Sequence, residues 1–275
     1  MELDVSNLRQ PAVVAAFRGW NDAGEAATSV IRHLVLGNET HEVLVFDEGY
    51  YDLRQSRPIV HTHDGKKVLK WPNTCMAVCR TPQRDLLVVV GDEPNFDWAD
   101  LCQEILATIT QCHATPVVVL GSMNSDDPHS RPLPVSVDAT NHDLVWGMGT
   151  EESDYSGPTG ITGVLSLVAA EAGHDVVSMW VSTPSYTADE ECAKATLALA
   201  RRVSEVLGVD FDWAALEKSA DQWEQQVTEL VETDPDMLRY VRALEASSDR
   251  SLAPTSGEDL AAQIEEFLRD GDDGG

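Results

Sequence analysis

The residues best suited to acid–base chemistry gather in one short segment, SMNSDDPHSRP, at positions 122–132. His129 is the strongest candidate for a general acid or base, because the reference pKa of imidazole lies near neutrality. Arg131 could hold a carboxylate through two parallel hydrogen bonds. The alternative interpretation is a proline-stiffened loop in which Asp126 or Asp127 pairs with Arg131 and fixes the shape of the loop.

A second candidate site is the segment YSGPTGITG at 155–163, which could bind an anion. Its Gly-Pro pair would fix a turn, and Thr159 could cap the helix that follows. There is no acid between Tyr155 and Ala170, so free backbone N–H groups at the helix start could hold a carboxylate or a phosphate. The simpler interpretation, an ordinary capped helix, is favoured because the pattern is short.

The turn around Gly19 follows an apolar run, where a dinucleotide-binding protein would place the pattern G-x-G-x-x-G. Asn21 stands where the central glycine would be, and Trp20 adds bulk where a backbone should meet a pyrophosphate. Asp22 and Glu25 have the spacing of a capping box, so their side chains are expected to bind the free backbone N–H groups at the start of the helix. Trp20 and Asn21 are then predicted to point outward and serve recognition.

Other catalytic and metal-binding patterns are incomplete. There is no phosphate-binding loop, and Ser122 follows Gly121 without the second glycine of a nucleophile elbow. His61 and His63 would share one strand face, but no third ligand has metal-site spacing. The five cysteines form no C-x-x-C pair and indicate reduced, mostly buried thiols. We therefore predict neither a metal site nor a cofactor.

The charge of the chain excludes some classes of partner. Its 19 Lys and Arg stand against 47 Asp and Glu, a formal net charge of -28. Such a surface repels nucleic acids and anionic membranes, and no basic stripe interrupts it. No apolar run approaches the roughly 20 residues that span a bilayer, and the N-terminal MELDVSNLRQ does not resemble a secretory signal. A cytoplasmic protein is expected.

The elements that must position these residues alternate between strand and helix. Because short apolar runs alternate with amphipathic stretches, we predict an α/β fold with a mostly parallel sheet and helices on both faces. Asp64-Gly65 predicts a hairpin between 57–63 and 66–71. This hairpin and the region 121–155 are interpreted as insertions, and functional groups are expected where strands end. The predicted strands are 11–17, 42–46, 85–90, 115–121 and 175–181, and helices are predicted over 24–36, over 98–112 and from Ile161.

The pattern changes after Gly208, which suggests an α/β domain at 1–208 and an acidic helical extension with a frayed tail at 209–275. The extension carries an apolar stripe with heptad spacing. We favour packing of this stripe on the α/β domain; the alternative is contact with another subunit or protein. A shorter helix at 237–244, a linker at 247–257 and a last helix at 259–268 follow. The stripe consists of Trp213, Leu216, Ala220, Trp223, Val227 and Leu230.

Five segments taken together resemble the bacterial form of the proteasome-assembly-chaperone family. In chain order they are GWNDAGEAA (19–27), GDEPNFDW (91–98), LGSMNSDDPHSRP (120–132), YSGPTGITGVL (155–165) and TPSY (183–186). Residues 211–245 resemble the extension of actinobacterial members, and the likeness covers roughly residues 10 to 270. It implies a fold similar to the nucleoside-phosphorylase/hydrolase class. Eukaryotic relatives help to assemble the α-ring of the 20S proteasome, so the resemblance implies a protein partner, with proteasome subunits as candidates.

The same resemblance implies a homo-oligomer, with a trimer as one candidate. Two departures from the family are visible. Ser185 stands where the family often has a histidine, so any chemistry of that histidine would be lost. The chain ends in GDDGG and lacks the hydrophobic-Tyr-any ending with which some partners dock on the proteasome, so any docking would use a surface.

Two functions follow from these observations. The first is an interaction protein that binds its partner through the strand-end loops, with Trp20 as an anchor, or through the acidic helices. The second is a small-molecule-binding protein or a hydrolase- or phosphorylase-like enzyme, with His129 and Asp22 as the catalytic candidates. Convergence of the candidate side chains on one concave pocket would favour the second. Those side chains are Asn21, Asp22, Asp92, Ser122, His129, Arg131, Thr159 and Tyr186.

Overall fold

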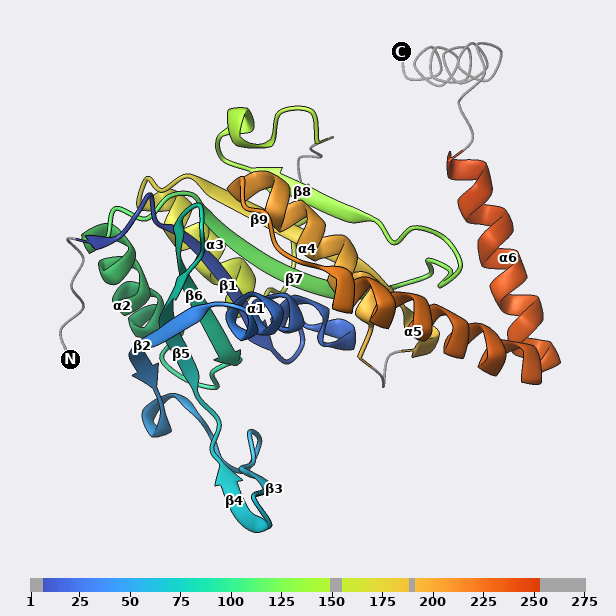
Figure 1. Cartoon of the computed structure of the whole chain (residues 1–275), viewed down its shortest axis with the longest axis horizontal. Helices are drawn as coiled ribbons and strands as arrows, with labels where there is room; N and C mark the ends of the chain where they lie inside the picture. The colour runs from blue at the N-terminus through green and yellow to red at the C-terminus, as the bar shows by residue number, and fades with distance from the viewer. Residues whose placement is uncertain (1–6, 149–154, 188–190, 253–275) are drawn as a thin grey trace, which may run out of the picture.

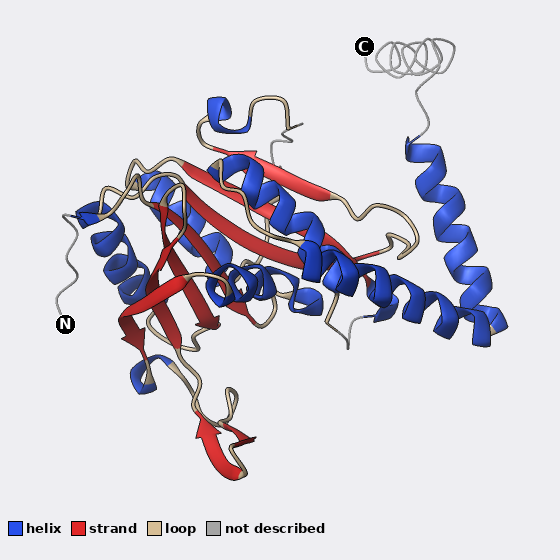
Figure 2. Ribbon diagram, in the orientation of Figure 1, coloured by secondary structure: helices blue, strands red, loops and turns tan. Residues whose placement is uncertain are grey.

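A seven-stranded mixed sheet forms the centre of the molecule (Figures 1 and 2). The computed structural model describes residues 7–148, 155–187 and 191–252. The strand order is β2-β5-β6-β1-β7-β9-β8, in which β6, β1, β7 and β9 run parallel and the other three pair antiparallel. This confirms the predicted α/β class. The strands are β1 (Ala12–Arg18), β2 (Glu39–Phe46), β5 (Thr74–Arg80), β6 (Asp85–Asp92), β7 (Val117–Ser125), β8 (Val135–Ala139) and β9 (Val176–Pro184).

Helices cover both faces of the sheet, as predicted. The central strand β1 is apolar and buried from Ala12 to Phe17 because its side chains alternate between two cores. Val14 and Ala16 belong to the core under α1 (Ala26–Leu36), α4 (Ala193–Leu207) and α5 (Ala214–Thr233). Val13 and Phe17 belong to the core under α2 (Trp98–Gln111) and α3 (Ile161–Glu171). The last described helix, α6 (Pro235–Leu252), extends beyond the sheet (Figure 1).

Two strands of the sheet were not predicted, and both are antiparallel. β5 is a buried strand between β2 and β6, but its sequence, TCMAVCR, contains few of the β-branched and aromatic residues that mark strands. β8 lies inside the region interpreted as an insertion and forms the edge of the sheet beside β9. The 121–155 region therefore contributes to the sheet, which corrects that interpretation.

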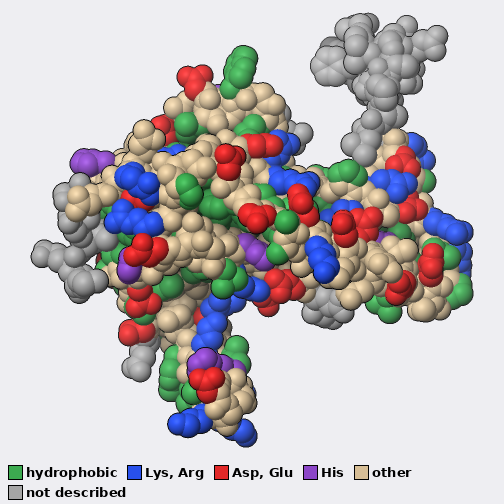
Figure 3. Space-filling model, in the orientation of Figure 1, with side chains coloured by type: hydrophobic (Ala, Val, Ile, Leu, Met, Phe, Trp, Pro, Cys, Tyr) green, Lys and Arg blue, Asp and Glu red, His purple; other side chains and the backbone are tan. Residues whose placement is uncertain are grey.

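The predicted hairpin is confirmed and forms a separate two-stranded sheet. β3 (Ile59–His63) and β4 (Lys66–Lys70) are joined by Asp64 and Gly65, whose φ angles of 49° and 73° are those of a type I′ turn. Every residue of the two strands is exposed. Figures 1 and 3 show the hairpin projecting from the body of the molecule, with basic and hydrophobic side chains on it.

The stripe of α5 packs on the protein's own α/β core. Leu216, Ala220, Trp223, Val227 and Val231 are buried in the cluster that also contains α1 and α4. Leu230, which was predicted to belong to the stripe, is 66% exposed. Four residues after Val227, rather than three, the helix returns to its buried face, so Val231 takes that place.

The prediction of a linker after α6 is wrong for its first part. α6 continues through Leu252, because side chains of its last turns bind the body of the protein, as described below. Residues 253–257, the helix predicted at 259–268 and the tail lie outside the described residues. Gly208 ends α4 in the left-handed conformation, with φ of 61°, at the predicted boundary, and the division into 1–208 and 209–275 stays a prediction. Within the described residues, none of the helices has the length and apolarity needed to cross a bilayer.

Candidate functional site

The turn after β1 exposes one of its two candidate recognition residues and buries the other. Trp20 is 67% exposed, as predicted, whereas Asn21 is 3% exposed, so its predicted outward position is wrong. The Asn21 side-chain amide donates to Glu93 Oε1 at 3.2 Å, and its backbone carbonyl accepts from Ser122 N at 2.8 Å. Asn21 therefore connects the turn after β1 to the end of β6 and to β7.

Asp22 holds the start of α1. Its Oδ1 accepts hydrogen bonds from Ala27 N (2.9 Å) and Thr28 N (3.1 Å), and its Oδ2 accepts from Thr28 Oγ1 (2.5 Å). Burial raises the pKa of Asp22, and these hydrogen bonds oppose that rise. The predicted capping box is incomplete, because Asp22 N donates to the Gly19 carbonyl and the carboxylate of Glu25 pairs with Arg32 at 2.9 Å. α1 accordingly begins at Ala26 rather than Gly24.

The candidate anion cradle at the start of α3 is occupied by a carboxylate of the chain itself. Glu93 Oε1 accepts from Ile161 N at 2.9 Å, so the first turn of the helix already binds an anion. Gly160, not Thr159, is the N-cap residue and has no side chain to cap the helix, which corrects the capping role predicted for Thr159. Thr159 is exposed, and a Cβ on Gly160 would collide with the Asn21 amide.

His129 is a buried structural residue. The residue is 2% exposed, and its side chain contacts α5 at Thr228. Nδ1 is 2.7 Å from the Tyr186 hydroxyl and Nε2 is 3.0 Å from Thr228 Oγ1, so both ring nitrogens have partners. Burial and the nearby Lys194 ammonium lower the pKa of His129. With no free ring nitrogen and little exposure, His129 does not fit the predicted acid–base role.

Arg131 does clamp a carboxylate, but the carboxylate belongs to α6. Its Nε and Nη2 donate to Asp249 Oδ1 and Oδ2 at 2.7 and 2.9 Å. Two further contacts join the same segment to α6: Ser130 Oγ donates to Glu245 at 2.5 Å, and the Tyr240 hydroxyl donates to Asp126 at 3.1 Å. We call these three contacts, made by Asp126, Ser130 and Arg131, the α6 latch.

The candidate side chains do not converge on one pocket. Asn21, Asp22 and Ser122 belong to the buried base of the β1 turn, where the Ser122 hydroxyl donates to the Ala23 carbonyl at 2.8 Å. His129, Arg131 and Tyr186 face α5 and α6, where Tyr186 also packs edge-on against Tyr240 with ring centroids 6.1 Å apart. Asp92 lines a cavity that none of the other candidates lines. The pocket expected from the sequence is therefore absent from the described part of the chain.

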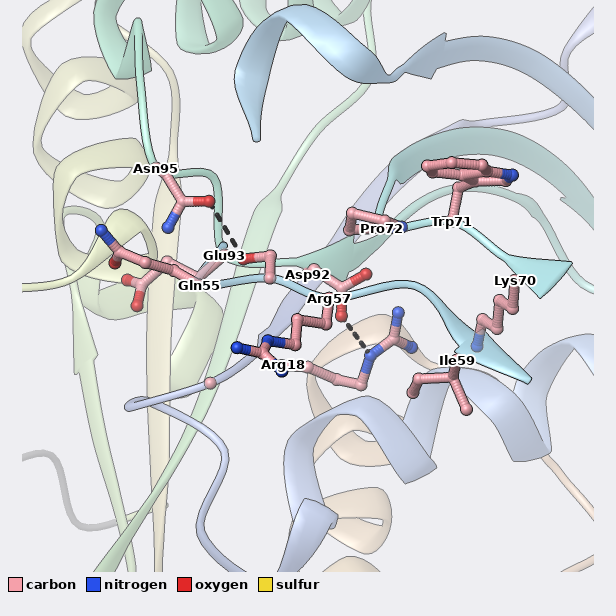
Figure 4. Close-up of a pocket in the computed structure, with 12 residues that line it drawn as sticks. Arg18, Gln55, Arg57, Ile59, Lys70, Trp71, Pro72, Asp92, Glu93 and Asn95 are labelled. Atoms are coloured by element: carbon pink, nitrogen blue, oxygen red, sulfur yellow. Dashed lines mark hydrogen bonds and ion pairs between the residues drawn. The ribbon is translucent and has the colours of Figure 1, made fainter. Parts of the chain in front are cut away.

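The cavity at Asp92 was not predicted. It has a volume of about 340 Å³ and lies between the base of the hairpin and the ends of β1 and β6 (Figure 4). Its charged lining residues are the cations Arg18, Arg57 and Lys70 and the carboxylates Asp92 and Glu93. The sequence signal was present but unused: the hairpin flanks carry Arg57, Lys70 and Trp71 in a chain with a large excess of acids.

Exposed apolar side chains surround the ends of the parallel strands. Trp20 follows β1, Phe96 follows β6, Met123 lies near the end of β7, and Tyr155 precedes α3. All four are exposed, and the strands that carry the first three are neighbours in the sheet. Their carboxyl ends meet at one edge, so these loops share a surface, which we call the apolar rim.

The metal-site candidates His61 and His63 lie on the exposed strand β3. Among residues 7–148, 155–187 and 191–252, no three His, Cys, Asp or Glu side chains form a group that could hold a metal ion. The five cysteines are free thiols, four of them buried.

The fold and the site define an α/β protein whose parallel strands end in a rim of exposed apolar side chains. Below this rim lie buried polar groups that are hydrogen-bonded to other groups of the same chain. The chain belongs to the PAC2 family, whose model matches residues 16–231.

Two solved structures share more than a third of their residues with it. A proteasome-assembly chaperone homologue from Mycobacterium tuberculosis, Rv2125, is 39% identical over 84% of this chain and 99% of its own, with a TM-score of 0.75. A PAC2 family protein from Streptomyces avermitilis is 38% identical over the same shares, with a TM-score of 0.76. PbaB from Pyrococcus furiosus, an archaeal proteasome activator, is 17% identical with a TM-score of 0.65 over 82% of this chain and 94% of its own, and shows the likeness of fold. No curated protein matches the chain.

Proposed function

We propose that this protein is an interaction protein of the assembly-chaperone type, which binds a protein partner through the apolar rim. The rim itself is the observation that carries the proposal. Four large apolar side chains, Trp20, Phe96, Met123 and Tyr155, are exposed on loops at one edge of the sheet. Grouped exposed apolar residues, and tryptophan above all, are typical of protein-binding surfaces.

The polar groups below the rim support binding over catalysis. The Asn21 amide, both Asp22 oxygens and Glu93 Oε1 form hydrogen bonds with backbone or side-chain groups of the same chain. A catalytic group must reach substrate atoms, and these groups are engaged in holding loops and helix starts. The base therefore fixes the rim in a preformed shape, which lowers the entropy lost on association.

The family supplies the candidate partner. Relatives are described as a proteasome-assembly chaperone homologue and an archaeal proteasome activator, which supports subunits of a 20S proteasome as the partner of this chain. Family membership also supports a homo-oligomer, and an intracellular partner would place the protein in the cytoplasm. The acidic surface, with a net charge of -28, suits a protein partner better than a nucleic acid or an anionic membrane.

A binding assay with purified 20S α and β subunits tests this function. The wild type should retain subunits on an affinity support, and Trp20→Ala should reduce the retained amount at least tenfold, because the variant removes the largest exposed anchor of the rim. Leu36→Ala is the matched control, because Leu36 is also highly exposed but lies at the far end of α1.

Failure of the wild type to retain either type of subunit would contradict the proteasome as partner. A loss of thermal stability in Trp20→Ala, with retention unchanged, would instead assign Trp20 to folding.

A further inference from the structure

The cavity at the hairpin base is built from two parts of the chain that face each other. The register of the hairpin places Ile59 directly opposite Lys70, so these two side chains share one face, and Arg57 precedes Ile59 by two residues. Arg18, Asp92 and Glu93 line the cavity from the ends of β1 and β6. In Figure 4, the Lys70 and Ile59 side chains lie next to each other, on the hairpin side of Arg18.

Two cations in this cavity are available for a ligand. Arg18 is neutralised, because its Nε donates to Asp92 Oδ1 at 2.8 Å. The second Asp92 oxygen accepts from Asn73 N at 3.2 Å, and Glu93 is engaged by Asn21 and Ile161. Arg57 and Lys70 make no ion pair or side-chain hydrogen bond with any other described residue. In a chain with a net charge of -28, two such cations at one cavity point to an anionic ligand.

The cavity also offers apolar surface and a hydrogen-bond donor. Ile59 and Trp71 both line it and are about half or more exposed, at 63% and 48%. Asn95 Oδ1 accepts from Asp52 N (2.8 Å) and Ser56 Oγ (3.0 Å), while its side-chain NH₂ makes no hydrogen bond within the described residues. A ligand that suits these walls has an apolar or aromatic group next to its charge.

The charge of the lining favours a single negative charge on the ligand. Three cations and two carboxylates line the cavity, so it carries one excess positive charge. A dianion such as a phosphate monoester would meet the repulsion of Asp92 and Glu93, whereas a carboxylate would not exceed the available positive charge. Arg57 offers the planar fork that binds a carboxylate with two hydrogen bonds.

We propose that this cavity binds a carboxylate attached to an apolar group, with Arg57 and Lys70 supplying the positive charge of the site and Trp71 and Ile59 its apolar surface. The free carboxyl end of a peptide chain and a small carboxylic acid share this chemistry. None of the four rim residues lines this cavity, so the test of the cavity does not depend on the proposed protein partner.

Titration calorimetry of the full chain tests the ligand class with four probes. These are a short acetylated peptide ending in leucine with a free carboxyl group, the same peptide as its C-terminal amide, phenylacetate, and inorganic phosphate. The free-acid peptide or phenylacetate should bind, and the tighter of the two identifies the source of the carboxylate. The amide should bind at least tenfold more weakly than the free acid, because it lacks the negative charge. Equal affinity for acid and amide, no binding of either acid at millimolar concentration, or equally tight binding of phosphate would overturn the proposal.

Charge-removing variants test the assignment of residues. Arg57→Gln and Lys70→Gln should each weaken the binding of the tighter acid about tenfold. Lys67→Gln is the matched control: it removes the same charge from the same strand, but Lys67 pairs with Thr62 on the opposite face of the hairpin. Because all three residues are exposed, the variants should melt at the wild-type temperature. An equal loss of affinity in Lys67→Gln would show attraction by net charge alone and contradict the site.

Discussion

The buried polar residues of types that often act in catalysis stabilise loops and helices in this protein. Asn21, Asp22, Ser122 and His129 are each less than a tenth exposed, and each has hydrogen-bond partners from other loops or helices. A buried polar group without a partner destabilises the fold by about 1–3 kcal/mol, so such residues bond within the chain. The residues that remain free to bind something else are the exposed ones, Trp20, Arg57 and Lys70 among them.

The close approach at Gly160 gives the first residue-scale prediction. A Cβ at this position would overlap the Asn21 amide and the Glu93 carboxylate, which hold the base of the rim. Gly160→Ala should therefore lower the free energy of unfolding by about 1–3 kcal/mol, the usual effect of overpacking, in urea denaturation. Gly37→Ala is the control, because a Cβ on Gly37 meets nothing within 4 Å. Equal stabilities of the two variants would contradict the tight packing at Asn21.

His129 gives a prediction about pH. Its pKa in the folded protein is below the ordinary value of 6.5, because burial and Lys194 disfavour the charged ring. The unfolded chain therefore binds more protons here as the pH falls below 6.5, and the folded state loses stability. The wild type should lose more unfolding free energy than His129→Gln between pH 7.5 and pH 5.5.

Other titrating groups are common to both proteins, so the comparison isolates His129. His61→Gln, on the exposed hairpin, should keep the pH dependence of the wild type. A His129→Gln protein that is as sensitive to acid as the wild type would show that the ring titrates normally in the fold.

At the scale of elements, α5 and α6 are attached by different forces. α5 buries five side chains of its stripe in the core, whereas Val241 is the single buried residue among those of α6 whose burial is described. α6 is held by the α6 latch, by the contact between Tyr186 and Tyr240, and by Val241 and the partly buried Met237 and Leu238, which pack against the core. Polar surface contacts contribute less than core burial, so α6 should open before α5.

Hydrogen exchange of Arg131→Gln tests the latch. The variant loses the paired hydrogen bonds to Asp249, which lie at the surface and therefore contribute modestly to stability. Amides of α6 should exchange up to about fivefold faster, while amides of α5 should be unchanged. Arg239→Gln is the control, since Arg239 pairs with Asp236 on α6 itself. Faster exchange in α5 to the same extent would show that the two helices open together.

The elements also show how far sequence reasoning reaches. The parallel strands β1, β6, β7 and β9 were predicted because strands buried on both faces are continuous apolar runs. The hairpin was predicted because the turn chemistry of Asp64-Gly65 is local. β5 was missed because its burial arises from neighbours on both sides, and its Cys, Met and Ala residues carry a weak local signal.

The candidate site was less predictable than the fold because its partners are distant in sequence. The segment 122–132 was recognised as a chemically unusual loop, but Thr228, Glu245 and Asp249 lie roughly a hundred residues further along the chain. Nothing local distinguishes an arginine that waits for a substrate from one that holds a helix. The occupation of the α3 start by Glu93 is hidden for the same reason.

At the scale of the whole molecule, the hairpin is an appendage with a charge unlike that of the rest. β3 and β4 carry Lys66, Lys67 and Lys70 in a chain with a net charge of -28, and their residues are all exposed. The two hydrophobic core clusters contain no residue of either strand. An isolated two-stranded hairpin is marginally stable by itself, so its presence adds little to the stability of the body.

Replacing the hairpin with a short turn is therefore expected to leave the body folded. Ile59 and Lys70 are paired, so the chain ends at Pro58 and Trp71 are close enough for a two-residue Asn-Gly connection in place of Ile59–Lys70. The unfolding free energy of this protein should stay within about 1 kcal/mol of the wild type in urea, because no core contact is removed. Binding of the free-acid peptide should be lost, since the replacement removes Lys70 and Ile59, whereas retention of the rim's protein partner should persist. A loss above about 3 kcal/mol would mean that the hairpin supports the sheet, and its marginal role in the fold would be wrong.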